Sequence, residues 1–103
     1  MGYLQEPPPI YEYAEARETI VAALNPIDRA ELMAISHNLK VNGTVSQQEA
    51  FKLQVSEIDG IVIRDKKAIP KAVSELRSKI LDNPAYGPFK TFTAKDQDPL
   101  LPR

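Results

Sequence analysis

Few residues of this chain have the chemistry that enzymes or metal sites use. His37 is the one histidine among 103 residues, and cysteine is absent. A lone histidine cannot form a histidine pair around zinc, and nucleophilic catalysis needs a nucleophile with a base beside it. Asp59-Gly60 lacks the spaced oxygen ligands of a calcium loop and is typical of a turn. The sequence therefore predicts a protein that is not an enzyme and uses no metal or cofactor.

The sequence also argues against nucleotide and membrane binding. Its four glycines are too scattered for a loop that cradles phosphates: Gly2, Gly43, Gly60 and Gly87. No apolar run approaches the roughly 18 residues of a membrane span, and the first nine residues lack the pattern of a signal peptide. Without cysteine there is no disulfide framework. We expect a cytoplasmic protein.

The charges are distributed unevenly along the chain, although the net charge is only -1. Residues 1–35 carry six acidic and two basic side chains, whereas residues 64–79 carry six basic and two acidic ones. The two segments are either solvated faces or partners that align helices within one chain or between copies. The basic segment also suggests an alternative function, a small nucleic-acid-associated regulator. The acidic first segment and the net charge count against it.

A short motif near the N-terminus matches a known protein-recognition pattern. Pro8-Pro9-Ile10-Tyr11 has the PPxY form that WW domains bind through preformed polyproline geometry. The alternative is that residues 1–9 are simply an extended proline-rich arm, because proline fixes its own backbone torsion.

The spacing of apolar residues predicts helices through most of the chain. Residues 10–24 fit a first helix, and Asn25 followed by Pro26 is a typical helix start. We expect the second helix to end near Gly43, where glycine permits a left-handed backbone. Pro70 opens a final helix that reaches about Leu81.

The segment between these helices supports two interpretations. Ser46 and Glu49 have the spacing of a capping box, which favours a third helix toward Ile58, followed by a short extended piece over residues 61–63. Alternation of apolar residues from Phe51 onward, with Asp59-Gly60 as a turn, favours a β-hairpin over residues 51–63 instead.

The predicted fold is mainly α, a small single domain of three to four helices. The domain spans residues 10–82, with an extended arm at residues 1–9 and another at residues 83–103. Only about seventy residues build the core, a size at which the folding free energy is typically a few kcal/mol. Self-association or docking onto a partner would add to that stability, so we expect a homo-oligomer.

Residues 48–81 resemble the C-terminal half of tail assembly chaperones from long-tailed bacteriophages. The resemblance lies in the segment QEAFKLQVSEIDGIVIRDKKAIPKAVSELRSKIL, where an apolar stretch runs into Asp59-Gly60, a short hydrophobic piece and a closing helix. It covers about a third of the chain, and the N-terminal part departs from the strand-rich opening of that family. The resemblance implies a non-enzymatic protein that binds a tape-measure protein and forms a multimeric coat around it.

The sequence therefore predicts a protein-protein interaction module, with phage tail assembly as its most specific form. Its expected partner is another protein, such as a tape-measure or other structural protein, rather than nucleic acid or a membrane. The candidate partner-binding residues are Pro8, Pro9, Tyr11, Lys71, Arg77, Phe89 and Phe92.

Overall fold

The computed structural model describes residues 8–90, and these residues contain helices and turns but no strand. The α-helices are α1 (Ile10–Ala23), α2 (Pro26–Asn42), α3 (Val45–Arg64) and α4 (Ile69–Leu76). A π-helical turn, η1 (Arg77–Leu81), continues α4, and a 3-10 helix, η2 (Pro84–Phe89), follows it. The mainly helical class is confirmed, as are the positions of the first, second and final helices.

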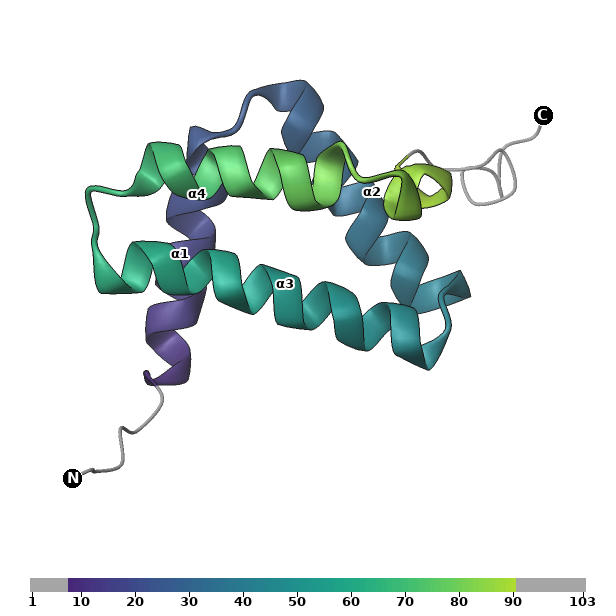
Figure 1. Cartoon of the computed structure of the whole chain (residues 1–103), viewed down its shortest axis with the longest axis horizontal. Coiled ribbons are helices and arrows are strands. Elements are labelled where there is room, and N and C mark those ends of the chain that lie inside the picture. Colours follow the sequence, from purple (N-terminus) through teal and green to yellow (C-terminus); the bar gives the residue numbers. More distant parts are fainter. Residues whose placement is uncertain (1–7, 91–103) are drawn as a thin grey trace, which may run out of the picture.

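The long helices cross rather than follow one another as a simple bundle. Helices α3 and α4 lie side by side and antiparallel, and α1 crosses behind both near the turn that joins them (Figure 1). Helix α2 lies at the other end, where it contacts η1 and η2. Helix α1 therefore packs chiefly on α3 and α4, which are distant from it in the sequence.

The hydrophobic core lies where these elements meet. Each helix contributes side chains that are withdrawn almost completely from water, which stabilises the fold by about 1.5–3 kcal/mol for each large aliphatic group. The largest of them are Ile20, Ile35, Leu39, Ile58, Leu76, Ile80 and Leu81.

The two helix starts at Asn25 and Thr44 use side-chain caps. The Asn25 side chain accepts a hydrogen bond from the Asp28 backbone N–H at 2.8 Å, as the Asn-Pro pattern predicts. Helix α3 begins with a reciprocal capping box between Thr44 and Gln47. The predicted box that begins at Ser46 is therefore wrong, since Ser46 already lies inside the helix.

The β-hairpin alternative over residues 51–63 is also wrong, because this whole segment lies within α3. Ile58 and Val62 are buried, and Phe51 and Val55 are half-buried against the core. These four residues are spaced by three or four positions, so a helix places all of them on one face, whereas a strand would divide them between two faces. The predicted turn at Asp59-Gly60 and the extended piece over residues 61–63 are helical for the same reason.

Gly43 ends α2 for a reason that differs from the prediction. Its backbone is extended, with φ -80° and ψ 156°, rather than left-handed. A Cβ atom at this position would lie 2.7 Å from the backbone oxygen of Leu39. Glycine is thus required because position 43 lies so close to the Leu39 backbone, in the last turn of α2, that a side chain would not fit.

The C-terminal segment of the described chain packs onto the domain. Tyr86 of η2 is buried, donates a hydrogen bond from its hydroxyl to Gln54 Oε1 at 2.7 Å, and meets the Phe51 ring edge-on. The Phe89 carbonyl accepts a hydrogen bond from Asn38 Nδ2 at 2.9 Å. The prediction of an extended arm is therefore wrong for residues 84–89, because Tyr86 provides an aromatic side chain for the core to bury. Residues 91–103 lie outside the described residues.

Candidate functional site

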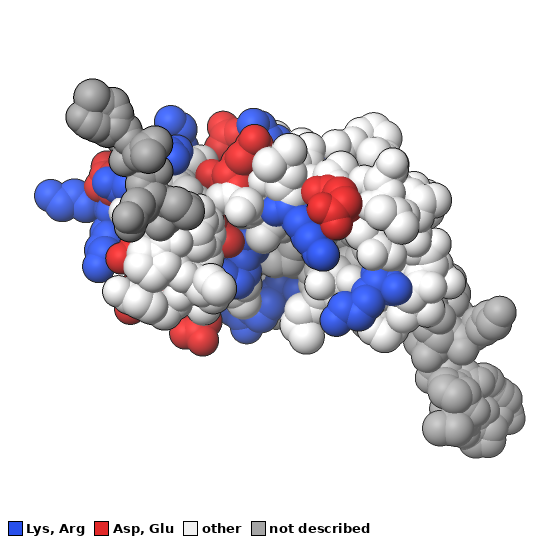
Figure 2. Space-filling model, turned by 90° about the horizontal axis from the view of Figure 1, so that it is seen from below, with Lys and Arg blue, Asp and Glu red and all other residues white. Residues whose placement is uncertain are grey.

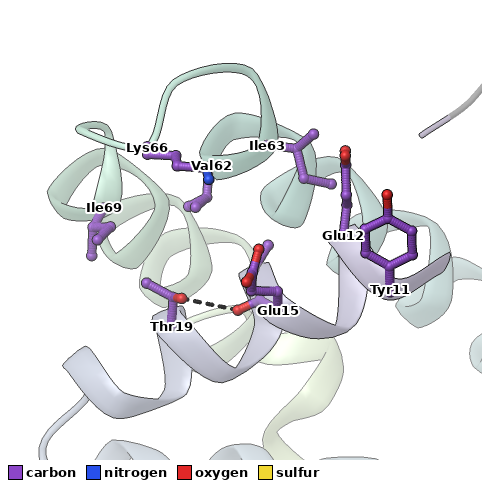
Figure 3. A pocket seen from close by; sticks show the side chains of 9 residues that line it. Tyr11, Glu12, Glu15, Thr19, Val62, Ile63, Lys66 and Ile69 are labelled. Carbon is purple, nitrogen blue, oxygen red and sulfur yellow. Dashed lines mark hydrogen bonds between the residues drawn. The ribbon is translucent and has the colours of Figure 1, made fainter. Parts of the chain in front are cut away.

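A groove of about 530 Å³ lies between α1 and the turn that joins α3 to α4 (Figure 3). One wall is the face of α1 formed by Tyr11, Glu12, Glu15, Ala16 and Thr19, which recur at helical spacing. The opposite wall is formed by Val62, Ile63, Lys66 and Ile69. Ala16 and Val62 are both buried between the walls, so the floor of the groove is apolar.

The side chains of the α1 wall carry negative charge and an exposed aromatic ring. Glu12 is half-buried and Glu15 is exposed, and neither forms an ion pair with another residue of the described chain. Tyr11 is 70% exposed at the end of the groove where α1 begins. The Thr19 hydroxyl donates to the Glu15 backbone oxygen at 2.9 Å. This wall therefore presents carboxylates and an aromatic ring to an incoming molecule.

The opposite wall is shaped by a short turn between α3 and α4. The Asp65 carboxylate accepts a hydrogen bond from the Lys67 backbone N–H at 2.9 Å, and the Asp65 carbonyl accepts one from Ala68 N–H. These bonds fix the turn and leave Lys66 exposed at the edge of the groove. Lys66 forms no ion pair within the part of the chain that the structure describes, although carboxylates stand on the opposite wall. The two walls thus carry opposite charges that are not neutralised by each other.

Behind the groove, an ion pair holds α1 against α3. Arg17 Nη2 lies 2.7 Å from Asp59 Oδ1, and the same guanidinium donates a hydrogen bond to the Val55 carbonyl at 3.2 Å. The Asp59 side chain is only 6% exposed. Burial raises the pKa of the Asp59 carboxyl above its ordinary value, and the positive charge of Arg17 opposes this shift. The pair fixes how α1 crosses α3, and hence the shape of the groove.

Asp59 was not among the predicted site residues, because Asp-Gly was interpreted as a turn. The signal that identifies it is its position one turn from Val55 and Val62, on a face that is otherwise apolar. An acidic residue on such a face requires a charged partner. Arg17 occupies the corresponding place on α1, next to the buried Ala16.

Three of the predicted partner-binding residues lie where α1 begins. Pro9 is the N-cap residue of α1 and has polyproline-like torsions, with φ -61° and ψ 152°. Pro8 is half-buried, and Tyr11 lies in the first turn of the helix. The polyproline geometry of the PPxY motif therefore extends only to Pro9, while Tyr11 belongs to the groove.

The remaining predicted residues are not brought together. Lys71 is exposed on α4, and Arg77 forms an ion pair with Asp28 of α2 at 2.6 Å. Phe89 is half-buried against the core, and Phe92 lies outside the described residues. The Arg77–Asp28 contact is the place where the acidic and basic segments of the sequence meet inside one chain.

The other charges of the basic segment gather around the α3–α4 turn. Arg64, Lys66, Lys67 and Lys71 are exposed and have no ion-pair partner within residues 8–90. Figure 2 shows positive and negative side chains intermixed at the end where α1 begins and this turn lies, on the left of the view. On the face that Figure 2 shows, the opposite end carries few charged side chains, in agreement with residues 41–48, which contain none.

The described residues contain neither a cluster of metal-binding side chains nor a helix suited to cross a membrane. No group of three or more histidine, cysteine, aspartate or glutamate residues could hold a metal ion there. Among the same residues, no helix combines the length and the apolar character that a membrane span needs. In comparisons with known proteins, no family model, curated protein or solved structure matches this chain.

Proposed function

We propose that this chain is a non-enzymatic protein-protein interaction module that docks another protein chain at the groove between α1 and the α3–α4 turn. The observation that carries the proposal is the groove itself, whose apolar floor lies between a carboxylate wall and an exposed lysine. Grooves of this kind suit an amphipathic segment, because apolar side chains fill the floor and charged ones set the register.

Two exposed apolar residues in the first turn of α1, one of which lines the groove, support the same proposal. Ile10 is 86% exposed and Tyr11 is 70% exposed, and the two are adjacent in the first turn of α1. Large apolar side chains cost free energy when they face water, and tyrosine is enriched where protein interfaces form. Burial of this pair by a partner would therefore favour binding.

The most specific form of the proposal is a tail assembly chaperone that binds a tape-measure protein in the cytoplasm of a phage host. It rests on the resemblance of residues 48–81, with Lys71, Arg77 and the aromatic Phe89 and Phe92 as candidate contacts. Its first test is the gene order around the coding sequence. A gene for a long helical tape-measure protein immediately downstream supports this form, and a metabolic operon overturns it.

A binding experiment tests the groove directly. If the downstream gene encodes a tape-measure protein, that protein is titrated with the chain in a calorimeter, together with the variants Glu15→Lys and Glu18→Lys. Both positions are exposed acids on α1, but only Glu15 lines the groove. We expect Glu15→Lys to weaken binding roughly tenfold and Glu18→Lys to leave it unchanged. Equal effects of the two variants would show that the groove is not the docking site.

A second candidate function is the nucleic-acid-associated regulator, which the four exposed basic residues around the α3–α4 turn favour. If these residues contact phosphates, binding of a duplex falls roughly a hundredfold between about 50 and 200 mM salt. Fluorescence anisotropy with a labelled duplex measures this slope. The variant Lys66→Ala/Lys67→Ala/Lys71→Ala should flatten it, and binding that ignores salt would exclude this function.

A further inference from the structure

We propose that the occupant of the groove is a second copy of this chain, held in a two-fold symmetric dimer in which the α1 helices run antiparallel across the axis. The inference rests on the proposed docking function and names the partner. Three observations on the groove carry it: the order of its residues, its unneutralised charges and the exposed Tyr11 at one end.

The two ends of the groove differ in charge. Tyr11 and Glu12 lie at one end, where α1 begins, whereas Thr19 and Ile69 lie toward the other end, on the side of Lys66 (Figure 3). Tyr11 and Thr19 are two helical turns apart, about 12 Å along the α1 axis. The groove is therefore acidic and aromatic at one end, and basic and aliphatic at the other.

A two-fold axis perpendicular to α1 places unlike ends together. Under this symmetry, each contact occurs twice, and the acidic end of one copy faces the basic end of the other. Tyr11 then lies over Ile69 of the second copy, and Glu12 and Glu15 face its Lys66. A parallel arrangement would bring Glu12 against Glu12, which like charges disfavour.

The acidic and basic walls of the groove form no ion pair with each other within one chain, which supports the two-fold symmetric dimer. Glu15 and Lys66 line the same groove but form no ion pair with each other. A second polypeptide placed over the groove supplies a base for Glu15 and an acid for Lys66 at the same time, provided that it carries these two charges in the opposite order. A second copy related by the two-fold axis does so, and its Tyr11 supplies an aromatic side chain for the floor.

The contact area that a stable dimer needs is also compatible with this end of the molecule. A standard interface buries about 800 Å² on each partner. The groove alone is smaller than this, so residues that flank its two walls must also take part in the contact. Apolar contacts then form the centre, with charges around them, as in other protein interfaces.

The test is a charge-swap experiment on the purified chain alone, with mass measured by light scattering and sedimentation equilibrium up to about 1 mM chain. We expect wild type to have twice the mass of one chain at high concentration. Glu15→Lys or Lys66→Glu alone should raise the dissociation constant roughly tenfold to a hundredfold, because each changed contact occurs twice. An equimolar mixture of these two variants should dimerise like wild type, since every acid again faces a base.

Matched control variants show which face of the molecule forms the dimer contact. Glu18→Lys and Lys40→Glu make the same charge changes at exposed positions that do not line the groove, and they should dimerise like wild type. Circular dichroism confirms that each variant keeps its helices. If the groove variants and the control variants weaken dimerisation equally, the contact lies elsewhere and the inference is overturned. The same holds if the mixture of Glu15→Lys and Lys66→Glu does not dimerise like wild type.

The outcomes also separate this inference from the proposed function. A wild-type chain that stays at the mass of one copy throughout the concentration range overturns the dimer. If the same chain binds the tape-measure protein and Glu15→Lys weakens that complex, docking at the groove stands with a different occupant. If it neither dimerises nor binds, both proposals fail.

Discussion

Arg17 of α1 and Asp59 of α3 face each other at 2.7 Å, but water reaches them unequally: the Arg17 side chain is 24% exposed and the Asp59 side chain 6%. The guanidinium can turn toward solvent when its partner is lost, whereas the carboxylate cannot. The two partners of this ion pair are therefore not equivalent, and their removal should have different costs.

Replacement of Arg17 should destabilise the protein more than replacement of Asp59. We expect Arg17→Met to lower the free energy of unfolding by about 3 kcal/mol, since it leaves an unpaired buried carboxylate. Asp59→Asn should cost clearly less. Urea unfolding followed by circular dichroism measures both, and Arg17→Met/Asp59→Asn should cost less than the sum of the single changes. A lower cost for Arg17→Met than for Asp59→Asn would contradict this account.

Asp59 should also make stability depend on pH in an unusual direction. Its pKa is raised in the folded state above the ordinary value of 3.8, chiefly by burial, so the folded state holds the proton more tightly than the unfolded state. The stability of wild type relative to Asp59→Asn should therefore be highest below pH 3.8 and fall as pH rises from 3.8 through the raised pKa. Urea midpoints of both proteins at stepped pH measure the difference. A relative stability that increases with pH would show that the Arg17 charge outweighs burial.

The start of α3 can be assigned by mutation. Thr44→Ala removes the side-chain oxygen that accepts a hydrogen bond from the Gln47 backbone N–H at 3.1 Å, and should cost about 1 kcal/mol. Ser46→Ala is the control, because Ser46 is exposed inside the helix, where alanine is the better helix former. Thermal unfolding of the two variants separates them. A larger effect at Ser46 would mean that the helix begins two residues later.

Two glycines provide a matched test of local space. Gly43→Ala places a Cβ atom 2.7 Å from the Leu39 backbone oxygen and should destabilise by more than about 1 kcal/mol. At Gly87 a Cβ atom meets nothing within 4 Å, so Gly87→Ala should be neutral or slightly stabilising. Chemical unfolding measures both. If Gly43→Ala leaves the free energy of unfolding unchanged, position 43 must lie farther from the Leu39 backbone oxygen than the structure shows.

The helices that the sequence predicted well are those whose signals are local. Asn25-Pro26 marks a helix start through torsion and capping, which depend on neighbouring residues only. The apolar stripe of the final helix likewise reports its buried face. The secondary structure of residues 51–63 was harder to predict, because their apolar residues fit both the alternation of a strand and the spacing of a helix. Ile58 and Val62 are buried against helices that are distant in the sequence, and this burial favours the helix over the hairpin. A single sequence does not reveal which distant helices these residues contact.

The candidate site depends still more on distant contacts. Tyr11 was singled out for a four-residue motif, yet in the structure it belongs to a groove completed by residues more than fifty positions away, such as Lys66. Arg77 was singled out as a cation, but it is engaged with Asp28. Residue type predicts what a side chain can do, while the crossing of α1 over α3 and α4 determines what it meets.

That crossing has a consequence for synthesis on the ribosome. Helices α1 and α2 emerge first, but α1 packs chiefly on α3 and α4, so Ile20 stays uncovered until the residues of α4 have left the exit tunnel. The nascent chain must therefore carry an exposed apolar surface through most of its elongation, and it acquires its fold in a single late step instead of one hairpin at a time.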